Sequence, residues 1–298
     1  MMQFLTYIVV YPIILLVSRL PFGIMYKISD VLCFFVYRVF KYRIEVVQSN
    51  LKKVYPDYSK EELLKIEKEF YRHFVDVFLE MLKGFSISET EIRKRYTIDN
   101  LEVVQSLNDQ GKSGIMLSSH YGNWEWLISL GNRKELIGLK TFAAYSPIKN
   151  KYIDKAIRKN RGRFGVHLIS SKETIPTIIE NVNNKIQSGY GLIADQSPTL
   201  GHLKYFDYFL GQKVPVHTGA EKMAKKYDIP VLFIDTEKIK RGHYHSTMRV
   251  ISLEPLKEKD HAITKEFIRL MEIEIGRNPS YYFWTHKRFK HSNKAPKD

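Results

Sequence analysis

The stretch MLSSHYGNWEW, residues 116–126, decides how the chain is organised. It begins as an apolar run typical of a buried strand and ends as an apolar run typical of a helix. His120 and Glu125 lie at the junction. On one α-helix, residues five apart lie about 140° apart around the axis, so their side chains would not meet. The spacing therefore predicts His120 on a strand-to-helix turn and Glu125 in the first turns of the helix. Gly122 would permit the bend and Asn123 would cap the helix.

In that geometry the Glu125 carboxylate would accept a hydrogen bond from one imidazole nitrogen of His120, and the other nitrogen would act as a base. This is the base-plus-carboxylate arrangement of a Ser-His-Asp site without a protein nucleophile. A suitable reaction is proton abstraction from a substrate hydroxyl that then attacks an acyl carbon, because histidine titrates near working pH. For an isolated pair, a structural histidine near a helix start is the alternative.

Outside this stretch, the chain alternates between strand-like and helix-like segments. This pattern predicts a mixed, mostly parallel sheet flanked by helices. Ligands bind at the carboxyl ends of strands in such folds, and His120 lies two residues past one of them. Residues 197–215 read as a long loop, and Ser59 with Glu62 forms a capping-box pattern before an amphipathic helix that ends near Gly84. We expect strands near 114–118, 139–144, 166–169, 190–194, 230–235 and 246–252, and helices near 100–110, 122–131, 151–162, 172–184, 217–227 and 262–276.

The N-terminus is apolar and lacks the pattern of a cleaved signal peptide. Residues 4–17 carry no charge but are short for a bilayer span, which needs about 20 residues. Residues 22–43 mix aromatic and basic side chains, as in a helix that lies at a membrane interface. We expect membrane attachment, with the rest of the chain on the cytoplasmic face of the inner membrane. Two buried core helices are the alternative.

Composition narrows the possible partners. The 298 residues carry a formal net charge of +15, which attracts nucleic acid, anionic lipid or an acidic carrier protein. The sequence contains no nucleic-acid-binding motif, His-Glu-x-x-His zinc helix, Gly-x-Ser-x-Gly elbow or phosphate-binding loop, so we expect no nucleic-acid partner and no metal. The single cysteine, Cys33, cannot form an intrachain disulfide.

Several blocks in order along the chain resemble the lysophospholipid acyltransferase superfamily, and most closely its late lipid A acyltransferases, the lauroyl and myristoyl transferases. SSHYGNWEW is similar to that family's catalytic His-x4-Asp/Glu block. The other blocks that resemble it are YRIEVVQSNLKKVYPDYSKEE, YSPIKNKYIDKAIRKNRGRFG, ADQSP, HTGAEKMAKKYDIPVLF and NPSYYFWTHKRFK.

The resemblance implies a glycerolipid acyltransferase-like fold, with membrane-anchoring or interfacial helices over residues 1–45 and an acyltransferase domain over 46–298. It implies transfer of a fatty acyl chain from an acyl-carrier-protein or coenzyme A thioester to a hydroxyl of an anionic lipid A precursor, with no cofactor. His120 would be the general base and Glu125 its orienting carboxylate. The residues that the resemblance assigns to substrate binding are Arg161, Arg163, Asp195 and Gln196.

Two alternatives stay open at this point. The block ADQSP departs from the Asp-His form of the best-studied lipid A enzymes, so the acceptor could instead be a lysophospholipid, an aminolipid or a glycolipid. Outside enzymes, a basic protein that binds membrane surfaces would account for the charge but not for the ordered blocks. Asp195 could orient a substrate or only cap the turn that follows its strand.

Overall fold

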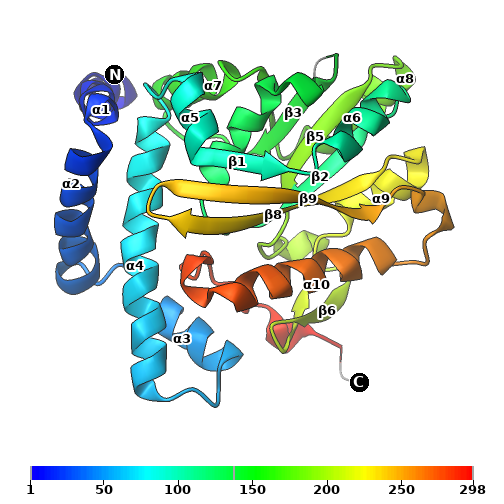
Figure 1. Cartoon of the computed structure of the whole chain (residues 1–298). Helices are drawn as coiled ribbons and strands as arrows, with labels where there is room; N and C mark the ends of the chain where they lie inside the picture. Colours follow the sequence, from blue (N-terminus) through cyan, green and yellow to red (C-terminus); the bar gives the residue numbers. More distant parts are fainter. Residues whose placement is uncertain (1, 137, 297–298) are drawn as a thin grey trace.

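A seven-stranded sheet forms the centre of the protein, whose computed structural model describes residues 2–136 and 138–296 (Figure 1). The strand order is β1-β9-β8-β2-β5-β3-β4. Every neighbouring pair is parallel except β8 and β9, which form an antiparallel hairpin. The prediction of a mixed, mostly parallel sheet is confirmed. The strands are β1 (Tyr96–Asp99), β2 (Gly114–Ser118), β3 (Lys140–Tyr145), β4 (Val166–Ser170), β5 (Ser188–Ile193), β8 (Val231–Lys240) and β9 (His243–Ser252).

Helices flank this sheet, as the alternating pattern predicts. The longest is α4 (Lys60–Lys83), and the predicted capping box begins it: the Glu62 amide donates to Ser59 Oγ at 3.2 Å, and the Ser59 amide donates to Glu62 Oε2 at 2.7 Å. The remaining α-helices are α1 (Met2–Arg19), α2 (Phe22–Phe34), α3 (Ile44–Val54), α5 (Glu89–Arg95), α6 (Glu102–Asp109), α7 (Lys151–Gly162), α8 (Thr174–Asn183), α9 (Gly219–Tyr227) and α10 (Ala262–Arg277).

The structure corrects one sequence expectation and refines another. Residues 197–215 are not all loop, because β6 (Phe206–Phe209) and β7 (Gln212–Pro215) pair there as a short antiparallel hairpin. The helix expected near 122–131 is present, and it is a 3-10 helix, η2 (Trp124–Asn132). Tertiary contacts hold both ends of η2. Near its start, the Trp126 indole donates a hydrogen bond to the Glu80 carbonyl. Near its end, Gly131 packs so closely on Phe164 that an added Cβ would lie 2.6 Å from the Phe164 carbonyl oxygen.

The N-terminal helices lie against α4 at one side of the molecule (Figure 1). α1 also contacts α7, where the Phe4 and Tyr152 rings are 5.2 Å apart. Among the described residues, α1 is the one helix long and apolar enough to cross a membrane. α1 and α2 pack on the rest of the chain. The expected domain division at residue 45 stays a prediction. The outward-facing sides of α1 and α2 expose Met2, Phe4, Leu5, Ile8, Val9, Ile13, Leu16, Ile24, Val31, Leu32 and Phe34.

Candidate active site

His120 lies on the turn that follows β2, two residues past the strand end, as the sequence predicts. Strand β5 lies next to β2 and runs parallel to it, so the carboxyl ends of the two strands meet. Asp195 follows β5 by two residues and is only 1% exposed. The two side chains meet across this edge, with Asp195 Oδ1 2.6 Å from His120 Nδ1. The sheet therefore builds a histidine–carboxylate pair from two strand ends.

The other nitrogen of the His120 ring faces a neutral partner. Gln196 Nε2 lies 3.3 Å from His120 Nε2. Since Asp195 is a hydrogen-bond acceptor, the pattern fits a ring that donates from Nδ1 and accepts the Gln196 amide at Nε2. The Trp124 and Phe283 rings lie 5.3 and 5.6 Å from the imidazole. His120 is thus held in one plane and one tautomer, with the lone pair of Nε2 available to a hydroxyl that displaces the amide.

The charges around His120 favour its protonated form. Burial alone lowers the pKa of an imidazole, but the Asp195 charge and hydrogen bond, together with the Glu125 charge, outweigh it and raise the pKa of His120 above its usual value. The same pairing overcomes burial at Asp195 and lowers the pKa of its carboxyl. The pair is therefore suited to stabilise an imidazolium that forms when His120 takes a proton.

Glu125 does not make the hydrogen bond that we expected from the sequence. Asp195 occupies Nδ1 of the His120 ring, and Glu125 Oε2 instead lies 2.5 Å from Nη2 of Arg161. The physical reason is the geometry of the neighbouring elements: Asp195 leaves an adjacent strand, and the last turn of α7 brings Arg161 to η2. Glu125 acts on His120 through its charge and fixes Arg161 beside the pair. Its catalytic role stays a prediction.

The two predicted substrate-binding arginines differ in their surroundings. Arg161 is about one-fifth exposed beside Glu125. Arg163 caps α7, and its guanidinium donates to the carbonyls of Gly84 (2.8 Å) and Ile87. Because these carbonyls lie just after α4, Arg163 ties α7 to the end of that helix. The structure thus gives Arg163 a structural contact, whereas Arg161 and Gln196 stay candidates for contact with substrate.

α4 holds the turn that carries His120 from one side. His73 Nε2 lies 3.1 Å from the carbonyl of Gly122, whose φ is +57°. Glu80 Oε2 accepts from the Asn123 amide at 2.7 Å, and the Asn123 side chain in turn caps η2 by accepting from the Trp126 amide at 3.0 Å. The predicted roles of Gly122 in the bend and Asn123 as cap are confirmed. The two buried residues of α4 were not identified from the sequence.

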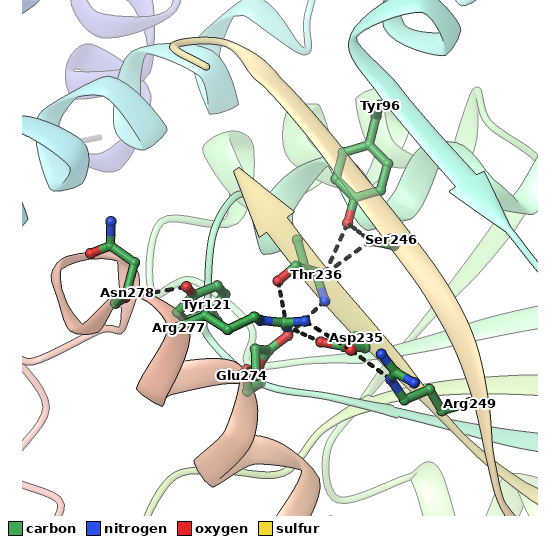
Figure 2. Close-up of polar contacts among 10 residues, drawn as sticks. Tyr96, Tyr121, Asp235, Thr236, Ser246, Arg249, Glu274, Arg277 and Asn278 are labelled. Atoms are coloured by element: carbon green, nitrogen blue, oxygen red, sulfur yellow. Dashed lines mark hydrogen bonds and ion pairs between the residues drawn. The ribbon is translucent and has the colours of Figure 1, made fainter. Parts of the chain in front are cut away.

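α10 holds the same turn from another side, through Ser119. The Ser119 hydroxyl donates to Glu274 Oε2, and the other oxygen of Glu274 accepts from the Thr236 amide at 2.8 Å. Figure 2 shows Glu274 reaching toward Thr236 of β8, with Arg277 and Asp235 paired beside them. Burial raises the pKa of Glu274 to about 8, so its carboxyl is mostly protonated at neutral pH. This network fixes the residue directly before His120.

The C-terminal segment completes the enclosure of the turn. The Phe283 amide donates to the His120 carbonyl at 3.1 Å, and the Gly122 amide donates to the Tyr281 carbonyl at 3.1 Å. His286 accepts a hydrogen bond from the Ser197 amide at 3.2 Å. Burial lowers the pKa of His286 to about 4, so its ring is neutral. With α4, α10 and this segment around it, the turn is held rigidly on three sides.

Such a site can perform general base chemistry on a hydroxyl. It has a fixed imidazole, a buried carboxylate behind it and an arginine nearby for negative charge. Among residues 2–136 and 138–296, no group of three His, Cys, Asp or Glu side chains converges to hold a metal ion.

Comparisons with known proteins agree with the resemblance seen in the sequence. The family model for bacterial lipid A biosynthesis acyltransferases matches residues 1–291. The lipid A biosynthesis palmitoleoyltransferase of Escherichia coli (strain K12) is 20% identical over 271 residues, which are 87% of this chain and 85% of the relative. The lipid A biosynthesis acyltransferase of Shigella flexneri matches with the same identity and the same coverage of both chains.

Proposed function

Because this chain belongs to the bacterial lipid A biosynthesis acyltransferase family and is an acyltransferase, we propose that it moves a fatty acyl chain from a carrier-bound thioester to a hydroxyl of a lipid A precursor. The observation that supports this reaction is the His120–Asp195 pair, whose Nε2 faces away from the carboxylate. A hydroxyl placed there can lose its proton as it attacks the thioester carbon.

The proposed step is a direct transfer. Nε2 of His120 takes the hydroxyl proton, the oxygen forms a bond to the acyl carbon, and the carbon–sulfur bond breaks. The imidazolium, stabilised by Asp195, then returns the proton to the departing thiolate, so the enzyme ends unchanged. Gln196 keeps the ring oriented until the hydroxyl replaces its amide. No acyl-enzyme forms, and the chain's own residues need no cofactor for this step.

Glu125 and Arg161 act together in this proposal. The Glu125 charge adds to the basicity of His120, and its ion pair holds the Arg161 guanidinium in place. Arg161 suits recognition of an anionic group on the donor or the acceptor, because arginine binds phosphate in a forked geometry. The basic surface, with a net charge of +15, would also attract an acidic acyl carrier protein.

The N-terminal helices supply the membrane contact of the proposal. α1 and α2 expose many apolar side chains, including Ile8 (49% exposed) and Val9 (64%). Exposed apolar surface of this extent is typical of a membrane or protein contact. We place this surface on the cytoplasmic face of the inner membrane, where an acyl carrier protein is present.

A reconstituted transfer assay tests the function. The purified protein in detergent receives acyl carrier protein or coenzyme A loaded with a labelled acyl chain, together with a lipid A precursor, a lysophospholipid or a glycolipid. We expect the lipid A precursor to gain one acyl mass by mass spectrometry, and His291→Ala, which removes a histidine outside the site, to leave the rate unchanged. Transfer only to another acceptor would refute the proposed substrate, whereas hydrolysis without transfer would refute the reaction.

A further inference from the structure

A cleft of about 510 Å³ lies away from His120, between α2, α4 and the end of β8. His120, Asp195, Gln196, Glu125 and Arg161 do not line it, but Tyr281, whose carbonyl accepts from the Gly122 amide, does. Four cationic side chains, Arg72, Lys238, Lys240 and Arg241, face two carboxylates there, those of Asp30 and Asp76. The lining therefore has an excess of positive charge.

Arg241 pairs with both carboxylates of the cleft. Arg241 Nη2 lies 2.7 Å from Asp30 Oδ1 and 2.7 Å from Asp76 Oδ1, and Arg241 Nε lies 2.9 Å from the other oxygen of Asp76. Ser29 also donates to Asp76. These bonds make the wall of the cleft rigid, and they pair both carboxylates with the same cation, Arg241.

Two of the other three cations have no side-chain partner in the part of the chain that the structure describes. The side chains of Arg72 and Lys240 make no hydrogen bond or ion pair with any residue in the described ranges, yet both line the cleft. Two cationic side chains that line the same cleft and have no partner among the described residues are available to bind an anion. Arginine can donate two parallel hydrogen bonds to a phosphate, and lysine adds a compact positive charge. Phosphate groups are bound by both kinds of donor.

The third cation, Lys238, is partly buried. Its Nζ donates to Nδ1 of His73 at 3.1 Å, and His73 donates from Nε2 to the carbonyl of Gly122. Burial, followed by the charge of Lys238, lowers the pKa of His73, so the partner of Lys238 is a neutral ring. Burial lowers the pKa of Lys238, against the nearby charges of Glu80 and Asp76. Among the described residues, Lys238 has no hydrogen-bonded anion, and it connects the cleft to the turn that carries His120.

We propose that this cleft is a second site, which binds a phosphate group through Arg72, Lys238 and Lys240. Val31 and Phe34 of α2, each 58% exposed, lie on the same helix as Asp30. A phosphate at the head of a lipid could therefore enter the cleft while its chains contact α2, and free phosphate is the other source of the same chemistry. The site goes beyond the proposed acyl transfer, since binding to it requires no acyl donor.

Calorimetric titration of the full-length protein in detergent with inorganic phosphate, at constant ionic strength, tests the proposal. We expect saturable binding that Arg72→Gln/Lys240→Gln weakens about tenfold or more, because it removes two charge-assisted contacts. The matched control Lys222→Gln/Lys265→Gln removes two exposed lysines from α9 and α10 and should bind as the wild type does. Arg72→Lys/Lys240→Arg, which keeps both charges, should retain most of the affinity, and thermal unfolding checks that each variant is folded.

Vesicle flotation identifies the source of the phosphate. Phosphatidylcholine vesicles with and without phosphatidic acid are mixed with the wild type and the same variants. Extra binding that depends on phosphatidic acid, and that is lost in the cleft variant alone, supports a lipid headgroup. Saturable phosphate binding without that dependence supports the free ion. The proposal is overturned if neither probe binds saturably, or if the cleft variant binds both probes as well as the control variant does.

Discussion

Replacing Asp195 by asparagine removes one negative charge behind His120 while keeping the shape of the side chain. The carboxylate is 1% exposed and lies 2.6 Å from Nδ1, so water cannot substitute for it. An asparagine amide can turn its NH₂ toward Nδ1. The ring would then carry its proton on Nε2, the atom that must accept the proton of the substrate.

The expected loss of rate follows from two contributions. A hydrogen bond to a charged group contributes about 1.5–3 kcal/mol, which corresponds to about 10- to 150-fold in rate if it strengthens only as the imidazolium forms. A ring locked in the wrong tautomer adds to this loss, and the equivalent change in serine proteases lowers kcat by about 10⁴-fold. We therefore expect Asp195→Asn to lower kcat by about 10²- to 10⁴-fold.

The pH dependence gives a second, independent signature. His120 must be neutral to act as a base, so kcat/KM rises with pH through its pKa. Asp195 raises that pKa against the effect of burial, so removing its charge moves the rise to lower pH. Steady-state acyl transfer measured across pH provides both values. Asp260→Asn, which changes an exposed ion pair with Lys225, is the matched control. A rate within threefold of wild type, with an unmoved acidic limb, would refute this role for Asp195.

Three further predictions follow from the same contacts. Glu125→Gln should shift the acidic limb of the kcat/KM profile to lower pH by less than Asp195→Asn does, because Glu125 acts on His120 only through its charge. The same change should release Arg161 from its ion pair. A pH profile identical to that of the wild type would contradict this role. Burial raises the pKa of Glu274 from 4.5 to about 8, so the wild-type free energy of unfolding should fall as pH rises across that interval. Glu274→Gln should flatten this fall in urea unfolding, and an unchanged slope would contradict the assignment. Val9→Glu on exposed α1 should weaken vesicle binding in flotation, whereas Leu253→Glu, an exposed apolar position after β9, should not.

Local patterns were sufficient to predict a mixed, mostly parallel sheet and the position of His120, but they did not reveal the edge strand β1. Alternating strand-like and helix-like segments predicted β2, β3, β4, β5, β8 and β9, because apolar runs bounded by turn residues mark most of them; β8 and β9, with ten residues each, extend beyond the predicted ranges. Glycine at position 122 and asparagine at 123 act within three residues, so their roles could be predicted. The β6–β7 hairpin was missed because its strands have four residues each.

The partner of His120 could not be chosen by spacing along the chain. Glu125 is five residues away in sequence, but Asp195 is 75 residues away and reaches the ring because β2 and β5 are neighbours. The strand order decides this contact, and periodicity does not encode strand order. Each residue does lie two positions after its strand, and that shared placement was the available signal. No such signal marks the polar residues that hold the turn from α4 and α10. These residues, His73, Glu80 and Glu274, lie within long amphipathic helices.

The central claim, that His120 is the base of a direct acyl transfer, is tested most directly by the single-turnover rate of His120→Asn. The assay follows a labelled acyl chain from the thioester to the lipid A precursor, and it records the intact mass of the protein during the reaction. General base catalysis contributes about 10²- to 10⁴-fold, so we expect a loss of that size and no acylated protein in either the wild type or the variant. A near-normal rate in the variant, or a protein-bound acyl group that passes to product, would contradict the account.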